Sequence, residues 1–159
     1  MDESDPRRLP WQKLIDIPPM WLALFLAMAW VQSVRWPLGP SGMALVDLAA
    51  GVLVGGGILL MGLALWEMRR ARTTVMPHLD ADALVTSGVF ARSRNPIYLG
   101  DVSLLTGLIL YWNAWPSLVL VPLFVWLITD RFIRPEEDRL RRRFGRQYEH
   151  WAQRVRRWV

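Results

Sequence analysis

The chain has 159 residues, of which 53% are hydrophobic, and it contains ten tryptophans and no cysteine. This length predicts one domain over residues 1–159, and the missing cysteines exclude disulfides and thiol nucleophiles. With His78 and His150 as the only histidines, we expect no metal site. The net charge of +5 is compatible with nucleic acid, but the arginines flank long apolar runs, as in anchoring to anionic lipids. We therefore expect a membrane protein that binds no nucleic acid.

The first apolar segment, residues 18–34, contains no formal charge. As a helix it would rise roughly 25 Å, enough for a thin or adapted bilayer. A cleaved signal peptide is the alternative, because "AMA" at residues 27–29 resembles a cleavage site. The later apolar segments and the acidic, proline-bearing residues 1–17 favour an uncleaved first span.

The second segment, residues 42–66, is interrupted only by Asp47. At its centre, Gly51 and Gly55 have the small-xxx-small spacing that lets a second helix approach closely. We interpret this spacing as tight packing within the chain, with a homodimer through the Gly51/Gly55 face as the alternative.

The third apolar segment, residues 97–129, is too long for one membrane helix, since it would rise roughly 50 Å against a hydrocarbon core of about 30 Å. The stretch "WNAWPS" at residues 112–117 supplies asparagine and proline for a turn. We predict a hairpin of two short helices at residues 97–112 and 116–132.

The positive charges give the topology. With four spans, all but Arg35 of the nineteen lysines and arginines fall on one side, which the positive-inside rule assigns to the cytoplasm. The expected fold is therefore all-α, an integral membrane helical bundle of about four transmembrane helices with a C-terminal amphipathic cytoplasmic helix. We expect a bacterial inner-membrane protein with both termini cytoplasmic and with residues 69–96 and 133–159 facing each other on that side.

The first of these polar segments contains the motif "SGVFARSRNPIYLG" at residues 87–100. Gly88 permits positive φ and close approach to a ligand, and Pro96 suits the first turn of a helix while it keeps Asn95 out of helical geometry. The free N–H groups of that helix and the Arg94 guanidinium would suit a carboxylate. The alternative is an ordinary arginine-rich flank with an Asn-Pro helix start.

The second polar segment contains "RPEEDRLRRRFGRQYEHWAQRV" at residues 134–155. Pro135 predicts a helix start there, with a bend at Gly145. Spacings of four, four, three and four residues form an apolar stripe opposite an arginine-rich face, the pattern of a helix at the membrane interface. The stripe consists of Leu140, Phe144, Tyr148, Trp151 and Val155.

The acidic pair Glu136 and Glu137 has two explanations. In the first turn of a helix these carboxylates interact favourably with the helix dipole, and pairing with Arg139 and Arg141 would explain them without any ligand. A site for a cationic group is the other explanation.

Asp101 lies one helical turn beyond Tyr98, inside the third apolar segment or at its rim. Ionisable groups at that depth are costly and usually face a partner or a water-filled cavity. Either the polar site extends along this helix face, or Asp101 is shallow enough to be solvated.

Together the two motifs resemble the isoprenylcysteine carboxyl methyltransferase and phospholipid methyltransferase families over about residues 50–155. The resemblance implies S-adenosylmethionine as cofactor and methyl transfer to a lipophilic acceptor that enters from the bilayer, either the carboxylate of an isoprenylcysteine-like compound or a lipid amine. We predict Arg94, Asn95, Tyr98 and Asp101 to be the catalytic residues, and of these Arg94 and Tyr98 match the family's first motif. The implied cofactor-binding residues are Gly88, Phe90, Arg94, Asn95, Pro96, Tyr98, Gly100, Glu136, Glu137, Leu140 and Tyr148.

Two positions depart from the family pattern. Asn95 stands where many members carry histidine, and Trp151 replaces the last tyrosine. An asparagine amide can hydrogen-bond to a cofactor but cannot titrate near neutral pH. Since "RNPIYLGD" also resembles sterol reductases, an NADPH-dependent membrane reductase is one alternative, and a non-catalytic membrane scaffold is the other.

Overall fold

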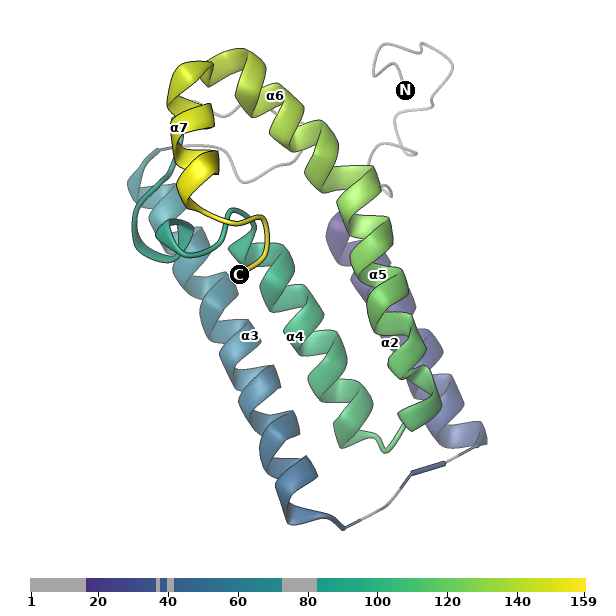
Figure 1. Cartoon of the computed structure of the whole chain (residues 1–159). Helices are drawn as coiled ribbons and strands as arrows, with labels where there is room; N and C mark the ends of the chain where they lie inside the picture. The colour runs from purple at the N-terminus through teal and green to yellow at the C-terminus, as the bar shows by residue number, and fades with distance from the viewer. Residues whose placement is uncertain (1–16, 37, 40–41, 73–82) are drawn as a thin grey trace, which may run out of the picture.

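The computed structural model describes residues 17–36, 38–39, 42–72 and 83–159, and this part of the chain is helical and without β-strand. The bundle drawn in Figure 1 contains α2 (Pro18–Arg35), α3 (Ala44–Arg70), α4 (Pro96–Tyr111) and α5 (Leu120–Ile128). The all-α fold predicted from the sequence is confirmed, while the predicted N-terminal segment lies, up to residue 16, outside the described residues.

Two helical stretches are long and apolar enough to cross a membrane, Ala44–Arg70 and Trp115–Phe144, and Pro96–Tyr111 is apolar but shorter. The outer surface of α3 is suited to contact with lipid, because large apolar side chains on it are more than half exposed. These side chains are Leu45, Leu48, Val52, Ile58, Leu59 and Trp66. The count of four spans stays a prediction.

Helices α3 and α4 pack closely through glycines. A Cβ added at Gly57 would lie 2.8 Å from the Gly100 carbonyl oxygen, and one at Gly107 would lie 2.9 Å from the Ala50 carbonyl oxygen. The prediction that Gly51 and Gly55 make this contact is wrong, since a Cβ at either meets nothing within 4 Å. Gly57 lies roughly 200° around the helix from Gly55, so the face of α3 that packs against α4 is not the face that contains Gly55. The homodimer stays a prediction.

The predicted hairpin is confirmed. Helix α4 ends at Tyr111, and α5 follows the short helix η2 (Trp115–Val119). Asn113 takes φ of +54° in the turn, a left-handed conformation that asparagine adopts more readily than most residues. At this end of the bundle the Ser117 hydroxyl donates to Gln32 Oε1 at 2.9 Å, which ties the turn to α2.

Helix α5 continues without a break through the π-helical segment η3 (Thr129–Ile133) into α6 (Arg134–Phe144). The prediction of a separate helix starting at Pro135 is therefore wrong. Pro135 has no N–H to donate, and the wider π turn before it accommodates the proline inside a continuous helix. The predicted bend is confirmed at Gly145, whose φ of +48° separates α6 from α7 (Arg146–Arg154).

Two apolar cores hold the chain together. The larger lies between α2, α4 and α5 and includes an edge-to-face contact of Phe25 with Phe124. The smaller core joins α3, the loop before α4 and α7, and its buried members are Ala64, Phe90, Tyr148, Trp151 and Val155. The predicted stripe on the C-terminal helix therefore does not face the membrane interface, because its last three members are buried against protein.

Candidate functional site

The loop that carries the first motif is fixed to the end of α3. The short helix η1 (Gly88–Ala91) starts at Gly88, whose φ is +55°, and a Cβ added there would collide with the Glu67 side chain. The Ser87 hydroxyl donates to Glu67 Oε2 at 2.9 Å. Glycine is therefore needed at position 88 both for its backbone conformation and for the close approach of Glu67.

The end of the loop is held by the tail that follows α7. Pro96 begins α4 as predicted. Just before it, the Arg94 N–H donates to the Arg156 carbonyl at 3.0 Å. Asn95 Nδ2 donates to the Arg157 carbonyl, also at 3.0 Å. The side-chain amide of Asn95, which stands at the position of the family histidine, thus already donates a hydrogen bond to the main chain of the tail.

A partly buried ionic cluster forms where the two motifs meet: the side chains of Glu137 and Arg94 are largely covered, while that of Arg157 is about one-third exposed. Arg157 binds Glu137 through both carboxylate oxygens, with Nε 3.1 Å from Oε1 and Nη2 2.6 Å from Oε2. Arg94 Nη2 lies 3.3 Å from Oε1 of the same carboxylate, and Arg94 Nη1 donates to the Tyr148 hydroxyl at 3.3 Å. Glu137 exposes only 7% of its surface. Two guanidiniums on one carboxylate leave this cluster with one surplus positive charge.

The cluster gives Glu137 other partners than those predicted from the sequence. Because α6 continues from η3, Glu137 does not lie at a free helix N-terminus. The predicted pairing with Arg141 is also wrong, since Arg141 binds Asp138 at 3.1 Å. Glu137 instead binds residues of two other segments.

The ionisation of the cluster follows from its contacts. The hydrogen bond from Arg157 to Glu137 raises the pKa of the Arg157 guanidinium above its ordinary value. Burial, with the charge of Glu137, raises the pKa of the Tyr148 phenol. At neutral pH the cluster therefore contains a permanent cation at Arg157 and a neutral phenol at Tyr148.

A second polar contact joins the motifs inside the bundle. The Tyr98 hydroxyl donates to Glu136 Oε2 at 3.2 Å. Tyr98 and Asp101 are both buried, at 7% and 6% exposure, so the alternative that Asp101 is solvated at the rim does not hold. The polar face predicted on α4 thus begins at Tyr98 and continues to Asp101.

The remaining predicted site residues lie in packing contacts. Phe90 and Leu140 belong to the smaller core, and Gly100 lies against Gly57 and Met61 of α3. The Trp151 indole N–H donates to the Phe90 carbonyl at 3.1 Å, so the tryptophan at the family tyrosine position retains a polar role. Sequence reasoning missed Arg157, and no pattern of local spacing marks it.

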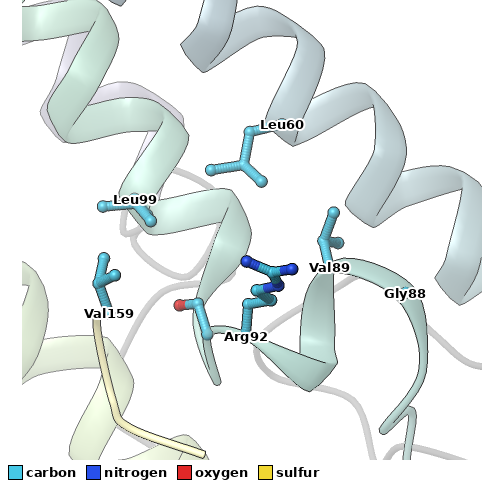
Figure 2. A pocket seen from close by; sticks show the side chains of 7 residues that line it. Leu60, Gly88, Val89, Arg92, Leu99 and Val159 are labelled. Atoms are coloured by element: carbon cyan, nitrogen blue, oxygen red, sulfur yellow. The ribbon is translucent and has the colours of Figure 1, made fainter.

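An apolar cavity of about 340 Å³ lies beside the first motif. Its lining comes from α3, the loop, α4 and the tail, and consists of Leu60, Gly88, Val89, Arg92, Ser93, Leu99 and Val159. Figure 2 shows the Arg92 side chain rising between Leu99 and Val89 toward Leu60. The cavity therefore combines membrane-helix leucines with one guanidinium.

Comparison with known proteins identifies the family. A family model described as phospholipid methyltransferase matches residues 45–147, which is more than half of the chain. The chain belongs to the phospholipid methyltransferase family. No significant match was found among curated proteins or among solved structures.

Membership in the phospholipid methyltransferase family confirms the resemblance seen in the two motifs and supports a membrane methyltransferase. The matched residues include the first motif and both acidic residues Glu136 and Glu137. The match ends at residue 147, so the tail that binds Glu137 lies beyond it.

Proposed function

We propose that this phospholipid methyltransferase family member transfers a methyl group from S-adenosylmethionine to a lipophilic acceptor at the cytoplasmic face of the membrane. The observation that carries the proposal is the partly buried cluster of Arg94, Glu137 and Arg157 at the junction of the two motifs. The amino-acid part of this cofactor has an ammonium and a carboxylate, so its site needs both signs of charge.

The residues present fit that group. Arg94 Nε is buried and has no hydrogen-bond partner in the described part of the chain, and the cluster has a surplus positive charge. A carboxylate would supply both the missing acceptor and the missing negative charge. Within the described residues, Glu137 Oε2 accepts one hydrogen bond, from Arg157, and a carboxylate oxygen has room for a second donor such as an ammonium.

When bound, the cofactor supplies an activated methyl group for an in-line displacement. The chain then has to bind and orient both reactants and exclude water. Arg94 and Glu137 would orient the amino-acid part of the cofactor.

The acceptor we favour is a lipid amine rather than an isoprenylcysteine-like carboxylate. The Glu136 carboxylate accepts the Tyr98 hydroxyl and would repel a carboxylate acceptor, and Asp101 is buried one turn further along α4. An amine must lose a proton before its lone pair can attack the methyl carbon, and the Asp101 carboxylate is a suitable acceptor for that proton. The leucine-lined cavity beside the motif supports access from the bilayer.

The test of cofactor use is isothermal titration of the detergent-purified protein with S-adenosylhomocysteine and, separately, with NADPH. We expect saturable binding of S-adenosylhomocysteine alone. Binding of NADPH alone would support the reductase alternative, and binding of neither would support the scaffold.

The Glu137→Gln variant tests the assignment of the cluster. We expect its dissociation constant for S-adenosylhomocysteine to rise more than about tenfold, because the ammonium loses its charged partner. The control is Asp138→Asn on the same helix, whose carboxylate is exposed and binds Arg141. Equal affinities of the wild type and Glu137→Gln would contradict the assignment.

A further inference from the structure

The tail after α7 contacts both motifs through one residue. The Arg157 carbonyl accepts a hydrogen bond from Asn95 of the first motif, and the Arg157 guanidinium binds Glu137 of the second. The preceding carbonyl, of Arg156, accepts the Arg94 N–H. These contacts join residues 20 and 62 positions apart in the sequence, so the tail fixes the two motifs relative to each other.

Arg157 is also the closer partner of Glu137. It makes a two-point contact with a shortest distance of 2.6 Å, whereas Arg94 approaches one oxygen at 3.3 Å. A planar guanidinium bound through two N–H groups is the stronger arrangement. Glu137 is therefore held mainly by Arg157, and Arg94 is its looser partner.

The net charge of the cluster shows what binding by the second arginine, Arg157, changes. With Arg94 alone, Glu137 would form a closed neutral pair in which the arginine is committed to the carboxylate. With Arg157 present the cluster has a charge of +1, and Arg94 retains a buried donor, Nε, without a partner in the described residues. A second arginine on Glu137 therefore leaves Arg94 able to bind another carboxylate.

We propose that Arg157 is a positioning residue for the cofactor. Arg157 holds Glu137 and, through Glu137, the loop that contains Arg94. Arg94 therefore stays available to bind the carboxylate of the amino-acid part of the cofactor. This role rests on the proposed function. It also gives Asn95 a task other than proton transfer, since its amide fastens the tail that carries Arg157.

The test compares the binding of two ligands, S-adenosylhomocysteine and 5′-methylthioadenosine, which lacks the amino-acid part. In Arg157→Gln we expect affinity for S-adenosylhomocysteine to fall at least about tenfold and affinity for methylthioadenosine to change less than about twofold. Arg157→Lys keeps the charge but loses the planar fork, so we expect a partial recovery. The control is Arg154→Gln, three residues away, where the exposed side chain donates to the His150 carbonyl of its own helix α7.

Hydrogen exchange supplies a readout that needs no ligand. Exchange at the Arg94 amide, which donates to the tail, should rise in Arg157→Gln and stay at the wild-type rate in Arg154→Gln. Unchanged exchange in Arg157→Gln would show that the side chain does not hold the tail and would overturn the proposal.

The remaining outcomes separate the two proposals. Tighter binding of S-adenosylhomocysteine by Arg157→Gln would mean that Arg157 competes with the ammonium for Glu137, and an equal loss for both ligands would mean a general structural role. Either result overturns the positioning role of Arg157 but does not contradict the proposal that the wild-type protein binds the cofactor. A wild type that binds neither ligand would overturn the proposed function, and the positioning role with it, even where the exchange experiment confirms the contact.

Discussion

At position 151 the chain has tryptophan where the family pattern has tyrosine, and the structure gives this side chain a defined hydrogen bond. The indole N–H donates to the Phe90 carbonyl in a buried contact, and the ring packs edge-to-face on Tyr148 at 5.8 Å between centroids. Since Tyr148 in turn accepts a hydrogen bond from Arg94, Trp151 connects the smaller core to the candidate site.

Replacing this tryptophan tests that connection. Trp151→Phe leaves the buried Phe90 carbonyl without its donor, so we expect a loss of about 1–3 kcal/mol in the free energy of unfolding. The measurement is denaturant unfolding in detergent. Trp126→Phe is the control, because Trp126 is 64% exposed on α5, and there we expect a change within about 0.5 kcal/mol. Similar losses in both variants would contradict the importance of the Phe90 contact.

Among the elements, the α3–α4 pair positions the first motif. Glu67 near the end of α3 holds Ser87 and crowds Gly88, and the contact of Gly57 with Gly100 brings the backbones together at the last residue of the motif. The same pair exposes Gly51 and Gly55 on another face of α3. Gly57 on one side, and Gly51 and Gly55 on the other, therefore have different environments within one helix, which the small-xxx-small spacing does not reveal.

Alanine substitutions at Gly57 and Gly55 test this difference in environment. Gly57→Ala would bring a methyl group to 2.8 Å from the Gly100 carbonyl oxygen, and because that atom belongs to the backbone of α4, the helices must move apart. We expect a loss of about 1–3 kcal/mol of stability. Gly55→Ala meets open space and should be neutral or slightly stabilising in thermal unfolding. Equal melting temperatures for the two variants would contradict this packing.

For the whole molecule, the decisive feature is that the two motifs lie at one end of the bundle. In Figure 1 the loop before α4, α6 and α7 gather at that end, and the α4–α5 turn lies at the other. The positive-inside rule assigns the arginine-rich end to the cytoplasm, where we propose that the cofactor binds.

Cysteine labelling in intact cells tests this orientation, because the chain has no cysteine of its own. With a membrane-impermeable thiol reagent, we expect Tyr111→Cys beside the turn to react and Gln153→Cys in α7 to react only after lysis. Both side chains are exposed, so accessibility depends on the side of the membrane. The reverse pattern would contradict the predicted topology.

Several residues of the candidate site could be predicted individually from the sequence. Arg94, Tyr98 and the acidic pair stand out in the two motifs, and the structure pairs Arg94 with Glu137 and Tyr98 with Glu136. Arg157 was not predictable, because an arginine in an arginine-rich tail has no distinguishing local pattern. Gly100 fits the motif as well as Arg94 does, yet its contact is with α3, since the motif does not specify which side of the helix faces which neighbour.

The sequence by itself determined the helical class, the hairpin at residues 112–117 and the family, because apolar runs, turn residues and motif spacings depend on neighbours a few positions away. Only the tertiary structure decided that the C-terminal stripe is buried, that α5 runs into α6, and that Arg157 rather than Arg141 holds Glu137. These features depend on free energies of packing between distant segments. A buried carboxylate binds whichever guanidinium the fold brings within reach, and that choice is made by the whole chain.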